Sequence, residues 1–318
     1  MPAKDNFDYT RPKRFFSSHL ETIYPALFRK VKKVAPATHQ RVDTPDGDFL
    51  DLDWRKQGCS RLVIIQHGLE GSSDRPYMLG MAKCFYENGY DVLTWNFRGC
   101  SGEMNRTARF YHSGATEDLD SVVQAALPDY EDISLVGFSL GGNLTLKYLG
   151  EAARYPQVRR GVAISAPLDL DAGVDKLHTA NGLIYEKRFL RNLKKKIREK
   201  AFLMPDQIDV EKLRRVKTLR DFDDHYTAPL HGFQDATDYY RQCSAKYFLK
   251  GIKVPTLILN SINDPLLSQE SVDHELTADL PLVHLETTKH GGHVGFYQKS
   301  SQPYFWSEWR ALEFCQHH

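Results

Sequence analysis

The chain has 318 residues, of which 41% are hydrophobic and 26% are charged, a composition typical of a globular protein with a substantial core. Its 42 Lys and Arg nearly balance its 41 Asp and Glu, so the net charge of +1 gives no support for a nucleic-acid partner. We expect neither a signal peptide nor a transmembrane helix, because no apolar stretch has the length or the position of either.

The expected elements alternate between short apolar strands and amphipathic helices. In chain order we expect a hairpin over 38–55 that turns at Asp46-Gly47, a strand over 62–65, a helix over 77–88, a strand over 92–95, a helix over 115–127, a strand over 133–136, a helix over 140–149, strands over 162–164, 255–259 and 282–285, and a last helix that holds Trp306, Trp309, Leu312 and Phe314. This alternation indicates an α/β fold with a mostly parallel sheet and helices on both faces.

The alternation breaks between about residues 169 and 250, where the chain is rich in charge and helical in pattern. No apolar run in this stretch reads as a buried strand. We interpret 1–318 as one α/β domain and 169–250 as a cap inserted within it. The cap would cover the edge where the parallel strands end, which is where ligands bind in such folds.

Ser139 is the centre of Gly137-Phe138-Ser139-Leu140-Gly141, directly after the expected strand over 133–136. In a Gly-x-Ser-x-Gly elbow the serine projects from a sharp strand-to-helix turn, and the glycines leave room for that turn. The first N–H groups of the following helix point to the place where negative charge would develop. The motif therefore predicts the nucleophile of an acyl-transfer enzyme.

An activated serine needs a base and an orienting acid, and in this fold they follow it in the order acid, then histidine. Asp264 and His293 follow the last two expected strands and fit these roles. Asp169 is an alternative acid, since it follows an earlier strand. His290 is an alternative base, but we favour His293 because it directly precedes the Val-Gly-Phe stretch that leads to the last helix.

Two backbone N–H groups are expected to form an oxyanion hole. One belongs to Leu140, the residue after the nucleophile, and the other to Leu69 in the early loop His67-Gly68-Leu69-Glu70-Gly71. We interpret His67 as a structural histidine that bonds the loop backbone, because the role of base is already filled.

No cofactor and no metal are expected. His284, His290 and His293 lack the spacing and the cysteine or carboxylate partners of a metal site. The five cysteines are scattered without a CxxC spacing, which fits free thiols in a reducing compartment. We therefore expect a cytoplasmic protein.

Arg98, in Asn96-Phe97-Arg98-Gly99, follows an expected strand near the same edge of the sheet. We interpret it as a cation that pairs with a carboxylate inside the fold. Asp223 and Asp224 of the cap are candidate partners for a loop cation of this kind.

A strongly basic stretch runs from Lys187 to Lys200, with eight Lys or Arg against Glu199 alone. Its apolar residues share one helical face, so one interpretation is a cap helix with a solvated basic side. The alternative is contact with lipid headgroups at a membrane surface or with an anionic substrate.

Further motifs extend over nearly the whole chain and together resemble one family. They are Ser18-His19-Leu20-Glu21-Thr22-Ile23-Tyr24-Pro25, His67-Gly68-Leu69-Glu70-Gly71, Asn96-Phe97-Arg98-Gly99-Cys100-Ser101-Gly102, Tyr111-His112-Ser113-Gly114, the elbow, Asn263-Asp264-Pro265 and His290-Gly291-Gly292-His293-Val294-Gly295-Phe296. The chain resembles the YheT-like branch of the α/β-hydrolase fold superfamily, a group of esterases related to eukaryotic abhydrolase-domain lipases. The resemblance implies Ser139 as nucleophile, Asp264 as acid and His293 as base. It also implies cleavage of carboxylic esters with short to medium acyl chains, monoacylglycerols among them.

The sequence thus predicts a serine hydrolase whose partner is a small-molecule ester or lipid substrate. Aromatic residues of the cap, namely Phe189, Phe202, Tyr239 and Tyr240, are expected to line an apolar acyl site. A thioesterase, acyltransferase or peptidase on the same triad is an alternative, because the triad does not set the leaving group. A non-catalytic binding protein of the same fold is a further alternative, which the complete set of triad residues argues against.

Overall fold

A computed structural model describes residues 4–5, 9–151, 155–298 and 303–318, and these residues build one sheet of nine strands in the order β1-β9-β8-β7-β6-β4-β5-β3-β2. The strands from β4 to β9 and β1 run parallel, and the hairpin β2–β3 joins antiparallel to β5. The strands are β1 (Lys4–Asp5), β2 (Thr38–Asp43), β3 (Phe49–Arg55), β4 (Arg61–Gln66), β5 (Asp91–Asn96), β6 (Asp132–Phe138), β7 (Val158–Ile164), β8 (Thr256–Ser261) and β9 (Val283–Thr288).

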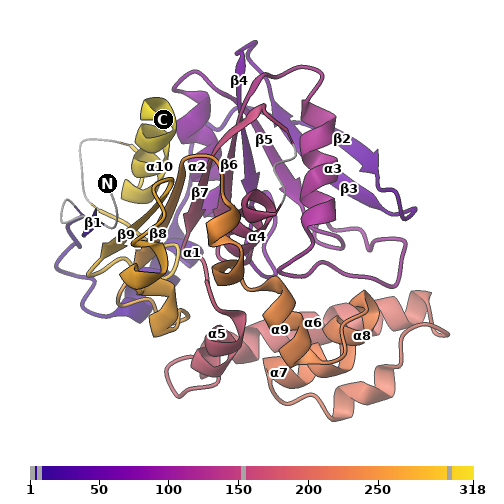
Figure 1. Ribbon diagram of the computed structural model, residues 1–318. Helices are drawn as coiled ribbons and strands as arrows, with labels where there is room; N and C mark the ends of the chain where they lie inside the picture. Colours follow the sequence, from indigo (N-terminus) through magenta and orange to yellow (C-terminus); the bar gives the residue numbers. More distant parts are fainter. Residues whose placement is uncertain (1–3, 6–8, 152–154, 299–302) are drawn as a thin grey trace.

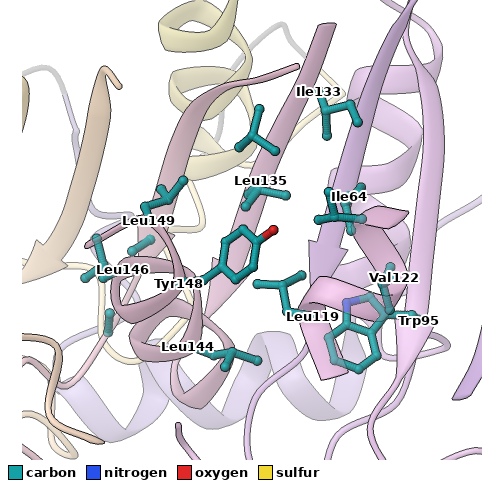
Figure 2. Close-up of a cluster of buried hydrophobic side chains, with 14 of the residues drawn as sticks. Ile64, Trp95, Leu119, Val122, Ile133, Leu135, Leu144, Leu146, Tyr148 and Leu149 are labelled. Carbon is teal, nitrogen blue, oxygen red and sulfur yellow. The ribbon is translucent and has the colours of Figure 1, made fainter. Parts of the chain in front are cut away.

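Helices cover both faces of this sheet, because the central strands are apolar on both sides. In β4, Leu62 and Ile64 face one apolar cluster, while Val63 and Ile65 face the other. Helices α3 and α4 pack on the first face, which Figure 2 shows, and α2 and α10 pack on the second. The helices outside the cap are α1 (Ser18–Phe28), α2 (Pro76–Tyr86), α3 (Thr116–Ala126), α4 (Leu140–Gly150) and α10 (Trp306–His317).

Residues 169–250, named the cap segment here, contain helices and no strand. In Figure 1 these helices gather below the sheet, while α3 and α10 flank it. They are α5 (Leu170–Leu177), α6 (Leu183–Leu203), η1 (Val210–Arg214), α7 (Leu219–Phe222), the π-helical turn η2 (Asp223–Thr227), α8 (Ala228–His231), α9 (Ala236–Cys243) and η3 (Ala245–Tyr247), with η4 (Leu249–Gly251) at the exit. The stripe Leu190, Leu193 and Ile197 of α6 is buried in an apolar cluster of its own, as its spacing predicts.

The predicted strands and helices are all present, with ends that shift by up to four residues. Helix α1 and strand β1 are absent from the predicted elements. Pro25 lies inside α1 and obscures its helical pattern, because proline cannot donate a backbone hydrogen bond. Strand β7 begins four residues before its predicted start, at Val158. The apolar run used for the prediction begins only at Val162, because Arg159 and Arg160 precede it; Arg160 lies in the strand and bonds Asp132 of β6 at 2.8 Å.

In the part of the chain that the structure describes, no helix is both long enough and apolar enough to cross a bilayer. All five cysteines are free.

Arg98 is buried and is surrounded by three carboxylates, as the expectation of an internal ion pair requires. Its guanidinium bonds Asp118 at 2.6 and 2.8 Å, Asp46 at 2.8 and 3.1 Å, and Asp48 at 3.0 Å. These hydrogen bonds and charges hold the pKa of Arg98 above its usual value despite burial. The network ties the β2–β3 turn to α3.

The candidate partners named from the cap segment were wrong. Asp223 accepts hydrogen bonds from the hydroxyls of Thr227 and Tyr240, and Asp224 accepts one from the N–H of Ala236. Burial raises the pKa of Asp223 to about 6. Both carboxylates therefore organise the cap segment itself.

Replacing Arg98 with Met keeps the apolar stem of the side chain but leaves Asp48 and Asp118 buried without their cation. We expect the free energy of unfolding, measured by urea titration, to fall by about 3–5 kcal/mol. The control is Arg106→Met, which removes an exposed pair with Asp43 and should cost less than about 1 kcal/mol. Equal losses for the two variants would contradict a structural role for the buried cluster.

Candidate active site

Ser139 occupies a strained turn between β6 and α4. Its φ of 53° and ψ of −118° are rare for a residue with a side chain. The flanking glycines are required by space: a Cβ on Gly137 would lie 2.1 Å from the carbonyl oxygen of Gly141, and one on Gly141 would lie 2.5 Å from that of His67. The turn therefore requires glycine at both of these positions, which explains the Gly-x-Ser-x-Gly motif.

The structure brings Ser139, His293 and Asp264 together at the edge where the parallel strands end. His293 Nε2 lies 3.0 Å from Ser139 Oγ, and His293 Nδ1 lies 2.8 Å from Asp264 Oδ2. The Nδ1–H of His293 donates to the carboxylate, so Nε2 is left to accept the serine hydroxyl proton. The other oxygen of Asp264 accepts the N–H of Leu266 at 2.8 Å, which fixes the carboxylate.

The loop that carries His293 is held by α1, a helix that the sequence did not reveal. Thr22 Oγ1 accepts the backbone N–H of His293 at 2.9 Å, and the buried carboxylate of Glu21 accepts the N–H of Gly291. Within the loop, Val294 has a φ of 57°, a conformation that needs such support. Glu21 and Thr22 are thus site residues that the prediction missed. The one signal for them was their place in the motif Ser18–Pro25.

The alternative acid and base lie elsewhere. Asp169 caps the N-terminus of α5 and forms an ion pair with Lys246, so it does not contact His293. His290 Nδ1 lies 3.5 Å from the side-chain nitrogen of Asn263. In the described residues, no group of three His, Cys, Asp or Glu is arranged to hold a metal ion.

His67 is fully buried and both of its ring nitrogens bond the backbone, as predicted. Nδ1 donates to the carbonyl of Gly68 at 2.8 Å, and Nε2 accepts the N–H of Phe97 at 3.1 Å. Burial lowers the pKa of His67 to about 3, so the ring stays neutral at neutral pH. His67 therefore ties two loops together.

The loop after His67 packs directly on the nucleophile. A Cβ on Gly68 would lie 3.1 Å from Ser139 Cβ, so only a glycine allows this approach without displacing Ser139. Leu69 and Leu140, whose N–H groups are the predicted oxyanion donors, both line the cavity that contains Ser139.

Two cavities meet at Ser139 and His293. The first, of about 130 Å³, lies under the cap segment and is mostly apolar; its walls include Leu177, Phe189, Phe222, Tyr239 and Tyr240. The second, of about 160 Å³, lies between α1 and α6. Phe202 was expected in the apolar wall, but its side chain is 86% exposed near the end of α6, so that expectation was wrong.

Comparison with known proteins agrees with this fold. The sequence profile of the α/β-hydrolase fold family matches residues 61–300. The assumed esterase YheT of Escherichia coli (strain K12) is 38% identical over 310 residues, which cover 94% of this chain and 90% of YheT. Phospholipase ABHD3 of Bos taurus is 28% identical over 314 residues, which cover 90% of this chain and 76% of the phospholipase.

Among solved structures, the esterase Pf2001 of Pyrococcus furiosus superposes with a TM-score of 0.60. The superposition covers 89% of this chain and 93% of the esterase, at 19% sequence identity. This similarity concerns the fold alone. The family profile and the similarity to YheT extend over most of the sequence. The chain therefore belongs to the α/β-hydrolase fold family, in the group that contains YheT.

Proposed function

We propose that this protein is a serine hydrolase of carboxylic esters, with Ser139 as nucleophile, His293 as general base and Asp264 as the orienting acid. The observation that carries the proposal is the position of His293, whose two ring nitrogens bridge Ser139 Oγ and Asp264 Oδ2 at 3.0 and 2.8 Å. Similarity to YheT and to a phospholipase supports the same reaction class.

In the proposed reaction, His293 Nε2 takes the hydroxyl proton while Ser139 Oγ attacks the ester carbonyl carbon. Asp264 stabilises the imidazolium that forms. The tetrahedral oxyanion is stabilised by the N–H groups of Leu69 and Leu140. His293 then gives the proton to the departing alcohol, and water releases the acyl group from Ser139 by the same steps.

The two cavities are suited to bind different parts of an ester substrate. The apolar cavity under the cap segment would take the acyl chain, since burial of apolar surface is its main source of affinity. Its volume of about 130 Å³ favours short to medium chains. The cavity between α1 and α6 would take the alcohol part, such as the glycerol of a monoacylglycerol.

The compartment is part of the proposal. All five cysteines are free, and Cys84, Cys243 and Cys315 are buried. Free thiols are typical of proteins in reducing compartments, so we place the reaction in the cytoplasm.

A panel of p-nitrophenyl esters of increasing chain length, acyl-CoA and peptide substrates tests this function. The wild type should cleave the esters with a preference for short to medium chains. Ser139→Ala and Asp264→Asn should lose at least roughly 10³-fold in kcat. Cleavage of acyl-CoA or peptides in preference to every ester would contradict the assignment to esters. Unchanged ester cleavage by Ser139→Ala would contradict the assignment of the nucleophile.

The loop that bears Leu69 is also fixed by the cap segment, through Glu70. Tyr111 donates its hydroxyl proton to Glu70 Oε1 at 2.7 Å, and Lys196 Nζ of α6 reaches the same oxygen at 2.9 Å. Glu70 has a φ of 54°, so its backbone is held in an unfavourable conformation. We infer that Lys196 is a positioning residue, which keeps the N–H of Leu69 directed at the oxyanion.

Lys196→Met keeps the stem of the side chain and removes the ion pair with Glu70. We expect kcat for a p-nitrophenyl ester to fall roughly ten-fold, less than the roughly 10²-fold that follows loss of an oxyanion donor itself, with KM nearly unchanged. Lys195→Met, at an exposed position of the same helix, is the control and should leave kcat unchanged. A rise in KM alone would refute the positioning role and assign Lys196 to substrate binding.

A further inference from the structure

The positive charge of this protein is concentrated in α6 and in the residues on either side of α1. Residues 11–33, which include α1, hold seven Lys or Arg and one carboxylate. Helix α6 holds eight Lys or Arg and two carboxylates. The whole chain has a net charge of only +1, so the remaining residues are net negative. Positive and negative charges are therefore separated on different parts of the protein, even though the total charge is small.

Much of this charge faces solvent without a counter-ion. Lys187, Arg188, Arg191 and Arg198 of α6 are exposed, and none of them forms an ion pair within the described ranges. Three other cations of α6 turn inward: Lys194 bonds the carbonyl of Val216, Lys196 bonds Glu70, and Lys200 is buried. The eighth cation, Lys195, is also exposed but forms an ion pair with Glu199. The helix thus separates its cations into a structural inner set and an exposed outer set, and all of the outer set except Lys195 lack an ion pair within the described ranges.

Apolar side chains are exposed beside these cations. On α1, Tyr24, Leu27 and Phe28 are 39%, 58% and 65% exposed, and their spacing of three and four residues places them on one face. At the start of α6, Ile184 is 60% exposed. Exposed apolar groups flanked by cations are typical of surfaces that bind a bilayer in its interfacial region.

Both groups of side chains adjoin the same opening. Ile23 and Ala26 of α1 line the second cavity, and they alternate with the exposed Tyr24 and Leu27. Arg188 and Asn192 line the opposite wall, and the exposed Lys187 and Arg191 are their neighbours on α6. The cavity reaches Ser139 and His293.

We propose that the surface formed by α1 and the outer face of α6 docks on bilayers that contain anionic phospholipids. The exposed apolar residues enter the headgroup region, and the unpaired cations contact lipid phosphates. The net negative charge of the other faces orients the molecule, so the second cavity opens toward the membrane. A lipid ester could then reach Ser139 from the bilayer without crossing water.

The test is flotation of full-length Ser139→Ala protein with vesicles of phosphatidylcholine, with and without phosphatidylglycerol. Because this variant lacks the proposed nucleophile, binding is measured apart from hydrolysis. The protein should float with the anionic vesicles at low salt, should be released at high salt, and should not float with neutral vesicles. Equal binding to both vesicle types, or to neither, would overturn the proposal while leaving the proposed esterase activity intact.

Two pairs of substitutions locate the surface. Lys187→Glu with Arg191→Glu reverses two outer cations, and Leu27→Ser with Phe28→Ser removes two exposed apolar groups. None of these four residues lines either cavity at Ser139. Each pair should weaken binding to anionic vesicles at least roughly ten-fold. Hydrolysis of a water-soluble p-nitrophenyl ester, with Ser139 restored, should not change and reports correct folding.

The matched control reverses two cations far from the proposed surface. Arg159 and Lys253 are exposed near the N-terminal ends of β7 and β8, at the edge of the sheet opposite to Ser139. Arg159→Glu with Lys253→Glu changes the net charge by the same amount and should leave vesicle binding within about two-fold. An equal loss of binding in this control would show that only net charge matters and would refute the surface.

Discussion

The contact between His293 Nε2 and Ser139 Oγ joins two residues that are 154 positions apart in the chain. It depends on the parallel sheet, since β6 and β9 deliver their C-terminal loops to the same edge. It depends equally on the crowded turn at Ser139, where Gly137 and Gly141 allow the backbone to close. The sheet sets the approximate positions of the two side chains, and the loops set them to within hydrogen-bonding distance.

That precision comes from polar anchors outside the sheet. Glu21 and Thr22 hold the loop of His293, so α1 positions this histidine without contributing a side chain to the hydrogen bond between His293 and Ser139. On the other side, α6 joins the cap segment to the body of the enzyme through Lys196 and Lys200. Lys200 Nζ donates to the carbonyls of Thr107 and Arg109 at 2.6 and 2.7 Å, in the stretch that leads to the apolar cavity. The cap segment is therefore bonded to the loops that shape the site.

The parts of this fold that the sequence predicts are those with a local signal. Apolar runs locate the strands, and the spacing around Ser139 locates the elbow. The order of Asp264 and His293 after late strands was sufficient to select the residues that lie together here. Side-chain pairing over long distances has no such signal. Arg98 meets carboxylates that are 20, 50 and 52 residues away, and the residues proposed for it pair within the cap segment instead. Pro25 alone was sufficient to hide the helical pattern of α1 from the sequence analysis. The roles of Glu21 and Thr22, which hold the loop of His293, were missed with it.

The claim most directly open to measurement is that His293 activates Ser139. A fluorophosphonate forms a bond to the serine oxygen and expels fluoride only when that oxygen is a good nucleophile. Intact-protein and peptide mass spectrometry should find one adduct, on Ser139, in the wild type at neutral pH. His293→Gln should slow its formation by at least roughly 10³-fold. An adduct at another residue, no adduct, or an equal rate in the two proteins would contradict the account.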